Sequence, residues 1–327
     1  MTSDSKRVDD QRRLAIFGAA AVAATSAFPG FAAQGADGGA VPFSAGVERP
    51  RWKAPAGAID CHIHIYDHRF PPAPNATLRP ADASLDDYAR LQRRLGTARM
   101  VIVQPSTYGT DNGCTLEALA NAGARARAVA VVDAGVDTAE LRRMDNLGVR
   151  GIRFNLVQTG ATTFEMLEPL AKRVAELGWH VQLHMKAEQI AQAADTLGRL
   201  PCPIVFDHLG RVPPSAGTGH PGFVAIRRLL DAGRTWMKLS GAYHDSISGP
   251  RAYADMAEVA RAYATAAPDR MVWGSDWPHP TKKDGEKPDD AWLFDLLEDW
   301  VPDADRRRQV MIDNPQALYG FGPATGN

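Results

Sequence analysis

The sequence predicts an α/β protein, a single-domain (β/α)8 TIM barrel. Short apolar runs alternate with amphipathic helical runs from residue 57 to residue 321, in the order and over the length typical of eight strands and eight helices. The strand-like runs are almost continuously apolar, which is typical of a parallel sheet covered on both faces. No Gly-x-Gly-x-x-Gly turn follows the first strand, and this disfavours a doubly wound open sheet.

Each element is assigned from its hydrophobic period and its flanking residues. Strands are expected at residues 58–65, 99–104, 127–133, 151–156, 180–184, 204–207, 235–239 and 271–275. Helices are expected between and after them, at residues 85–95, 115–124, 138–147, 163–177, 187–197, 222–232, 250–266 and 289–300. The barrel is therefore expected to span residues 57–321, followed by a short tail at residues 322–327.

The bulk composition argues against several classes of protein. The 327 residues are 45% hydrophobic and 23% charged, with a formal net charge of −1. This near-neutral balance argues against a nucleic-acid-binding protein, which needs a basic face, and gives no support to adhesion to anionic membranes. The three cysteines are too widely spaced for a disulfide framework or a Cys-x-x-Cys metal site. The composition leaves the oligomeric state open, and an oligomer is compatible with it.

The first 36 residues have the character of an export signal and are excluded from the fold. Arg12 and Arg13 precede an uncharged run at residues 14–36 that is rich in alanine and glycine. This pattern predicts a cleavable twin-arginine signal, so we expect a periplasmic or secreted protein without stable membrane association after signal removal. A transmembrane anchor is the alternative, but a Pro-Gly break and few large aliphatic residues disfavour it. Residues 37–56 are interpreted as a linker.

The first predicted strand carries the most informative motif of the chain. It contains Asp60-Cys-His-Ile-His64, and residues two apart on a strand share one face. Asp60, His62 and His64 are therefore expected on one face, with apolar residues on the other. Two imidazoles side by side on a rigid strand suit a catalytic divalent metal, although such a pair also occurs as hydrogen-bonded core histidines.

Polar and charged side chains occupy the carboxyl end of nearly every predicted strand. In (β/α)8 barrels the catalytic groups lie at this end, so the pattern favours an enzyme. The residues concerned are His62, His64, Gln104, Ser106, Arg153, Asn155, His184, Asp207, His208, Lys238, Ser240, Ser275 and Asp276.

Four of these strand ends together resemble the amidohydrolase superfamily. The segments that carry the resemblance are Asp60-Cys-His-Ile-His64, Gln182-Leu-His184, Phe206-Asp-His-Leu-Gly-Arg211 and Trp273-Gly-Ser-Asp-Trp-Pro-His-Pro280. More narrowly, the chain is similar to the amidohydrolase 2 branch, which includes lactone hydrolases of aromatic-acid and sugar-acid breakdown. The resemblance covers residues 57–321.

The resemblance implies a metal site. It makes His62, His64 and His184 imidazole ligands, and Asp276 a carboxylate that contacts the metal and takes the proton from the attacking water. Three imidazoles and one carboxylate leave a coordination position open and suit Zn²⁺ best, with Mn²⁺ or iron as alternatives. The fourth strand has no lysine that could be carbamylated to bridge two metals, so we expect at most one divalent metal ion per chain. Asp60 is interpreted as orienting a ligand histidine.

Further residues near strand ends are candidates for catalysis and substrate binding. The resemblance places His208 near the substrate or the open side of the metal, as a candidate catalytic residue, with a hydrogen bond to a neighbouring loop as the alternative. Arg153 and Arg211 are expected to bind an anionic group of the substrate through the planar guanidinium. The alternative for each arginine is a surface salt bridge without a functional role. The remaining candidates for lining the pocket are Ser106, Tyr108 and Tyr243.

The sequence therefore predicts a metal-dependent hydrolase that acts on a carboxylic ester bond and opens a small anionic lactone. In this interpretation metal-activated water attacks the ring carbonyl, with Asp276 as general base. Two alternatives keep the fold: a metal-dependent decarboxylase of an aromatic or related carboxylic acid, and a metal-independent sugar-acid lactone isomerase. A periplasmic small-molecule binder is the non-enzymatic alternative, because a fold alone does not fix a function.

Overall fold

The computed structural model describes residues 39–158, 160–249 and 253–323, and the structural statements below concern these residues. The expected export signal at residues 1–36 and the end of the expected tail lie outside them.

Eight parallel strands form one sheet in the order β1 to β8, which confirms the predicted TIM barrel. The strands are β1 (Ile59–Ile63), β2 (Arg99–Val103), β3 (Ala126–Ala130), β4 (Val149–Asn155), β5 (His180–His184), β6 (Ile204–Phe206), β7 (Thr235–Leu239) and β8 (Met271–Trp273). The chain just beyond β8 pairs with β1, because Asp276 N donates to His62 O and His64 N donates to Trp277 O, both at 2.8 Å. These two hydrogen bonds close the barrel at the carboxyl ends of its first and last strands.

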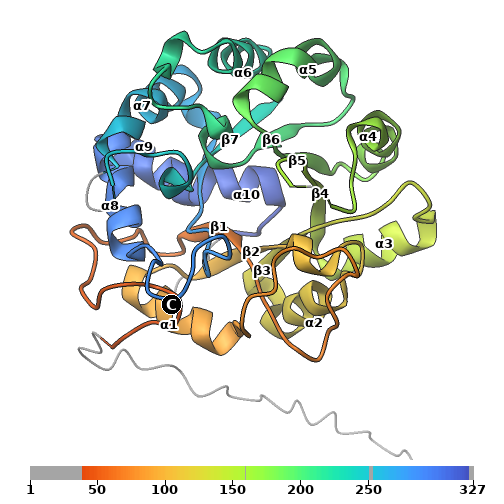
Figure 1. Ribbon diagram of the computed structural model, residues 1–327, viewed down its shortest axis with the longest axis horizontal. Coiled ribbons are helices and arrows are strands. Elements are labelled where there is room, and N and C mark those ends of the chain that lie inside the picture. Colours follow the sequence, from red (N-terminus) through yellow and green to blue (C-terminus); the bar gives the residue numbers. More distant parts are fainter. Residues whose placement is uncertain (1–38, 159, 250–252, 324–327) are drawn as a thin grey trace, which may run out of the picture. The chain divides into compact units, whose positions relative to one another are not determined.

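Helices surround the strands, as Figure 1 shows. They are α1 (Leu85–Leu95), α2 (Gly113–Ala122), α3 (Thr138–Leu147), α4 (Leu167–Ala175), α5 (Ala187–Arg199), α6 (Pro221–Asp231), α7 (Ala257–Ala266), α8 (Asp290–Trp300), α9 (Ala304–Arg308) and α10 (Asn314–Tyr319). The helix expected from residue 250 thus begins at Ala257, and residues 250–252 lie outside the described part. Within the described ranges, no helix combines the length and apolar character that a membrane span requires.

Helix α1 illustrates how local sequence fixes an element. Ser84 accepts a hydrogen bond from the backbone of Asp87, and the Asp87 carboxylate accepts one from the backbone of Ser84, so a capping box starts the helix. Gly96 ends it in the left-handed conformation, with φ of 81°. Tyr88 and Leu91 face inward and are completely buried, which packs the helix against the sheet.

One end of the barrel is closed by an apolar cluster. Tyr319 and Phe321, at the end of α10 and just beyond it, pack with strand residues that form a separate buried group. The strand residues of this cluster are Ile59, Cys61, Val101, Val103, Val129 and Val272. The Phe321 ring also lies under the guanidinium groups of Arg99 and Arg127, at the starts of β2 and β3, so this cluster marks the amino-terminal end of the barrel and the carboxyl end is left for a functional site.

The first strand departs from the expected alternation. Asp60 pairs with Met100 and Ile63 with Ile102, so β1 uses one more residue than β2 over this stretch. Such an irregularity breaks the two-residue period of a strand. Asp60 therefore does not share a face with His62: its Oδ2 accepts a hydrogen bond from Tyr88 of α1 at 3.1 Å, and its Oδ1 accepts from the backbone N of Ser275 at 3.0 Å. The expectation of one common face was wrong for Asp60.

Part of the segment interpreted as a linker is packed against the barrel. Val41 is buried, and the Trp277 indole donates to Pro42 O at 2.8 Å. Trp52 stacks on Phe294 of α8, with ring centroids 4.3 Å apart. This segment is packed rather than extended as a linker because it contains aromatic and apolar side chains. Burying them against the barrel is favourable, whereas an exposed linker would leave them in water.

Candidate active site

Three histidines and one aspartate meet at the carboxyl ends of β1, β6 and β8. Asp276 Oδ1 lies 3.4 Å from His62 Nε2, 3.4 Å from His64 Nε2 and 3.8 Å from His208 Nε2. All four side chains are buried. The predicted metal residues His62, His64 and Asp276 are therefore brought together, with His208 beside them.

Hydrogen bonds at the far side of each ring hold these histidines in place. His64 Nδ1 donates to Val103 O at 2.8 Å; because a carbonyl only accepts, the neutral ring presents an unprotonated Nε2 to Asp276. His208 Nδ1 lies 3.0 Å from Ser240 Oγ, and His62 Nδ1 lies 3.3 Å from Asp207 Oδ1. Partners of this kind orient histidines that bind metal ions.

The backbone at two of these positions is in the left-handed region. His208 has φ of 51° and Asp276 has φ of 65°, which are unusual values for residues with a β-carbon. Such conformations are retained where the surrounding structure imposes them, often at functional sites. Gly241 makes room for this arrangement: a β-carbon there would lie 2.5 Å from His208 Nδ1.

Burial and neighbouring charges shift the pKa values of the histidines and of Asp276 in this cluster. Burial, with a further contribution from Lys238, lowers the pKa of His62 to about 3. Burial also lowers the pKa of His208 well below its ordinary value. For Asp276 burial acts in the opposite sense, but His208 and the other histidines hold the pKa of the carboxyl well below its usual range. Neutral imidazoles around an ionised carboxylate are the forms that bind a divalent cation.

The donor set fits a divalent metal ion. The ligand atoms of His62, His208 and Asp276 all lie within 4.8 Å of one another. His62 Nε2 is buried and has no hydrogen-bond partner among the described residues, so a lone pair there stays available to a cation. Histidine nitrogen and carboxylate oxygen are the donor types that zinc and similar cations take in catalytic sites.

His184 is arranged differently from the other expected ligands. Its Nε2 accepts a hydrogen bond from Arg211 Nη1 at 3.0 Å, since the guanidinium can only donate. Its Nδ1 is buried without a partner, and its ring lies 5.2 Å from that of His208 between centroids. His208 therefore lies closer to Asp276 than His184 does. The role of His184 as a metal ligand stays a prediction.

The second oxygen of Asp276 is held by two residues that follow β7. Tyr243 OH donates to Asp276 Oδ2 at 2.5 Å, and His244 Nε2 lies 3.1 Å from the same oxygen. Tyr243 was expected to line the pocket, whereas His244 was missed by the sequence analysis. His244 lies in the connection beyond the strand end, and its position directly after Tyr243 is the only signal that could have indicated it.

A small cavity of about 30 Å³ lies next to this cluster, and an adjoining one of about 20 Å³ shares part of its lining. The residues that line both are Ser106, Arg153, Asn155 and Gln158. Asn155 donates to Ser106 Oγ at 2.8 Å, and Arg153 is anchored through Nε to Asp207 Oδ2 at 3.3 Å. The arrangement places a guanidinium and two small polar groups on the wall of a confined pocket beside the histidine cluster.

Two of the residues expected in the pocket are engaged elsewhere. Both oxygens of Asp245 accept hydrogen bonds from Arg211, at 2.6 and 2.9 Å, so the charge of that arginine is already paired. Tyr108 OH bonds the backbone N and O of Asp67, at 2.9 and 3.1 Å. Neither is among the residues that line the two small cavities, and their part in substrate binding stays a prediction.

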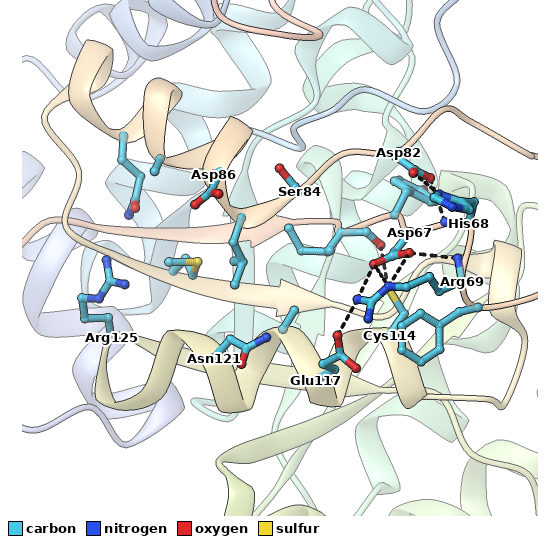
Figure 2. A pocket seen from close by; sticks show the side chains of 18 residues that line it. Asp67, His68, Arg69, Asp82, Ser84, Asp86, Cys114, Glu117, Asn121 and Arg125 are labelled. Atoms are coloured by element: carbon cyan, nitrogen blue, oxygen red, sulfur yellow. Dashed lines mark hydrogen bonds and ion pairs between the residues drawn. The ribbon is translucent and has the colours of Figure 1, made fainter.

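A larger groove of about 510 Å³ lies on the outside of the barrel, between α1 and α2 (Figure 2). Asp67, His68 and Asp82 at its rim form a second group with metal-ligand geometry. In Figure 2, Arg69 pairs with both Asp67 and Glu117, and His68 contacts Asp82. Because these groups are largely exposed and already paired with each other, the buried cluster is the better candidate for an active site.

The fold and this buried cluster define a (β/α)8 protein with a histidine–carboxylate centre. Comparison with known proteins shows that the chain belongs to the amidohydrolase family, whose model matches residues 59–321.

Individual relatives agree with this assignment. A 2-pyrone-4,6-dicarboxylate hydrolase of Comamonas testosteroni is 36% identical over 83% of this chain and 92% of its own length. A D-galactarolactone isomerase of Agrobacterium fabrum is 33% identical over 82% of this chain and 93% of its own. A ligand-free crystal structure of an Agrobacterium tumefaciens protein superposes with a TM-score of 0.79 at 31% identity, covering 86% of this chain and 99% of that one.

Proposed function

We propose that this protein is a metal-dependent hydrolase that opens a small anionic lactone, with Asp276 as general base. The observation that carries the proposal is the position of Asp276, whose Oδ1 faces three histidine Nε2 atoms next to a small cavity that Arg153 lines. The 2-pyrone-4,6-dicarboxylate hydrolase, which covers nearly the whole barrel, supports lactone hydrolysis as the reaction.

The metal would be held by His62, His64, His208 and Asp276, with His184 as a further candidate. When bound, a divalent cation supplies Lewis acidity that polarises the ester carbonyl and acidifies water. Asp276 then accepts the proton of the attacking water and returns it to the leaving oxygen of the opened ring. Tyr243 and His244 donate to Oδ2 of that carboxylate and so keep it in one orientation during both proton transfers.

The anionic group of the substrate would be bound by Arg153. Its guanidinium is buried to 4% exposure and is fixed at Nε by Asp207, so it meets a substrate carboxylate without much loss of side-chain freedom. Ser106 and Asn155 lie on the same wall and offer neutral hydrogen bonds.

A sugar-acid lactone isomerase is the second candidate. The D-galactarolactone isomerase is almost as similar to this chain as the hydrolase is. Such a reaction would use Asp276 and a histidine to move a proton or a ring bond and would consume no water. The two candidates differ in the acid that they release, because hydrolysis of a neutral ester bond produces a new carboxylate and a proton.

Titration of released acid at constant pH tests the proposal directly. Purified protein is screened against lactones that carry one or two carboxylates, while metal content is measured on the same samples. We expect ring opening with release of one proton per lactone and at most one divalent metal per chain. Isomerised product without acid release would contradict the hydrolase and support the isomerase, and two metals per chain would contradict the site.

The general base is tested by Asp276→Asn. We expect a folded protein whose turnover falls by at least about 100-fold, the usual range for loss of a positioned proton acceptor. Asp299→Asn is the matched control, since that carboxylate is exposed on α8 and, within the described part of the chain, pairs only with the exposed Arg51. Near-normal turnover in Asp276→Asn would show that another group takes the proton.

A further inference from the structure

A second layer of charged residues lies directly beneath the site. Asp207 follows β6 and Lys238 lies on β7; both side chains have zero exposure, and Lys238 Nζ is 3.5 Å from Asp207 Oδ1. Lys238 also donates to Cys61 O at 2.9 Å and to Gln182 Oε1 at 2.8 Å. The proposed reaction uses Asp207 only to fix Arg153 and gives Lys238 no role, yet burying two ions needs a reason because desolvation opposes it.

Asp207 contacts both halves of the site. Its Oδ1 lies 3.3 Å from His62 Nδ1, and its Oδ2 accepts from Arg153 Nε at 3.3 Å and from Gln182 Nε2 at 3.2 Å. His62 belongs to the metal-binding group, whereas Arg153 lines the substrate cavity. One carboxylate therefore joins the residue that faces the metal to the residue that faces the anion.

The proton of the His62 ring has two arrangements. On Nδ1 it is donated to Asp207 Oδ1, the three protons of Lys238 go to three oxygens, and Nε2 keeps a free lone pair. If the proton is on Nε2 instead, Nδ1 accepts a hydrogen bond from Lys238 Nζ at 3.2 Å. The nearest donor to Asp207 Oδ1 is then the same Lys238 Nζ, 3.5 Å away. The first arrangement offers a donor at 3.3 Å to Asp207 Oδ1, a buried atom with no other hydrogen-bond partner among the described residues, and it suits the unpartnered Nε2.

We propose that Asp207 is a positioning residue that keeps the His62 proton on Nδ1, so that Nε2 is free for a metal, and that holds Arg153 against the substrate anion. The role of Asp207 toward Arg153 rests on the proposed function, whereas its role toward His62 stands on geometry alone. Asp207 reaches both residues because it follows β6 directly before the left-handed turn at His208, and its side chain contacts His62 of β1 and Arg153 of β4 across the barrel interior.

The buried charges also indicate how to test Asp207 without unfolding the protein. Asp207 and Asp276 are balanced by Lys238 and Arg153. Asp207 itself contacts both cations, since its Oδ1 lies 3.5 Å from Lys238 Nζ and its Oδ2 lies 3.3 Å from Arg153 Nε. Asp207→Leu alone leaves Lys238 unpaired, whereas Asp207→Leu with Lys238→Met replaces an ion pair by apolar side chains of similar size.

The decisive measurement is the tautomer of His62 in metal-free protein. Long-range ¹H–¹⁵N spectra of ¹⁵N-histidine-labelled protein distinguish a protonated ring nitrogen from an unprotonated one, and His62→Gln identifies the signal. We expect Nδ1–H in the wild type. In the double variant we expect a mixture or Nε2–H, with Zn²⁺ bound about 10- to 100-fold more weakly in a competition assay with a chelator.

The matched control removes a different buried ion pair. Arg94 and Asp289 are 2.6 Å apart and almost fully buried, but they lie outside the site. Arg94→Met with Asp289→Leu should change the melting temperature while leaving the His62 tautomer, the Zn²⁺ affinity and the Michaelis constant as in the wild type. This control separates a general effect of losing a buried pair from a specific effect on His62.

The tautomer, the Zn²⁺ affinity and the Michaelis constant together decide between the possible outcomes. A wild-type ring protonated at Nε2, or a double variant that keeps Nδ1–H and the wild-type Zn²⁺ affinity, overturns the proposal. A changed tautomer with a Michaelis constant for an anionic lactone raised at least tenfold supports both halves. If the tautomer behaves as expected but no lactone is opened even by the wild type, the proposed function fails while the role of Asp207 toward His62 stands.

Discussion

At the scale of single residues, the site depends on keeping unlike protonation states side by side. The surrounding histidines, His208 foremost, hold the pKa of Asp276 well below its usual range against the effect of burial, whereas burial and Lys238 lower the pKa of His62. In the proposed reaction these two groups would act as a proton acceptor and a neighbouring lone-pair donor. The substrate would meet this pair beside Arg153, the cation that lines the small cavity.

Loss of Arg153 should affect anionic substrates selectively. Because a charge-assisted contact contributes about 1.5–3 kcal/mol, we expect Arg153→Ala to raise the Michaelis constant for an anionic lactone by roughly 10- to 100-fold. A neutral ester of similar size should change much less. Initial rates over a range of both substrates measure the difference, and Gln182 still donates to Asp207 in the variant.

Arg211→Ala is the informative comparison for that experiment. Asp245 already accepts two hydrogen bonds from Arg211, so the guanidinium brings little net charge to a substrate. We expect a smaller and less selective change than for Arg153→Ala. A larger, anion-selective change at Arg211 would reverse this assignment and support the role first inferred from sequence.

At the scale of elements, three connections at the strand ends assemble the site. The connection after β6 supplies His208 from a left-handed backbone, the one after β7 supplies Tyr243 and His244, and the one after β8 supplies Asp276. Gly241 lets the β7 connection approach His208 closely, since a β-carbon there would overlap that ring. The precision of the site therefore depends on backbone turns as much as on the side chains.

Gly241→Ala should damage the site through this contact. The added β-carbon would lie 2.5 Å from His208 Nδ1 at a residue with φ of 63°, so we expect His208 to be displaced and turnover to fall at least about tenfold. Backbone strain should also lower the free energy of unfolding by about 1 kcal/mol. Denaturant titration and steady-state rates measure the two effects.

Gly233→Ala is the control for Gly241→Ala. Gly233 also has a positive φ, of 88°, but a β-carbon there would meet nothing within 4 Å. We expect a similar loss of stability with normal turnover. Equal loss of turnover in both variants would mean that the strain, rather than the contact with His208, causes the effect.

At the scale of the whole molecule, the barrel separates stability from function. The apolar cluster in which Tyr319 and Phe321 pack on strand residues lies at the amino-terminal end, and the polar site lies at the opposite end. The chain matches its hydrolase and isomerase relatives over 92% and 93% of their lengths, so the similarity extends over both ends of the barrel.

We propose that the protein is exported through a twin-arginine signal. Arg12→Lys with Arg13→Lys keeps the positive charge but removes the guanidinium pair, so we expect full-length precursor to remain in the cytoplasm. The wild-type mature chain should begin between residues 34 and 40, as N-terminal sequencing of the exported fraction would show. Normal export of the Lys-Lys form would instead favour an ordinary secretory signal, and intact Met1 on membrane-fixed protein would favour an anchor.

The sequence by itself determined the order of the elements and the end of the barrel that holds the site. Alternating apolar runs set the eight strands and helices, because each must bury one face against its neighbour along the chain. His62, His64 and Asp276 were found together because the carboxyl ends of parallel strands converge in a closed barrel.

Only the tertiary structure decided which of the remaining polar residues meet. The irregular register of β1 turns Asp60 outward, left-handed backbone brings His208 to Asp276, and Asp245 pairs with Arg211. His244 reaches Asp276 across the barrel mouth from a connection with no regular period. These outcomes depend on contacts between distant parts of the chain and on local backbone departures, which hydrophobic periodicity does not encode.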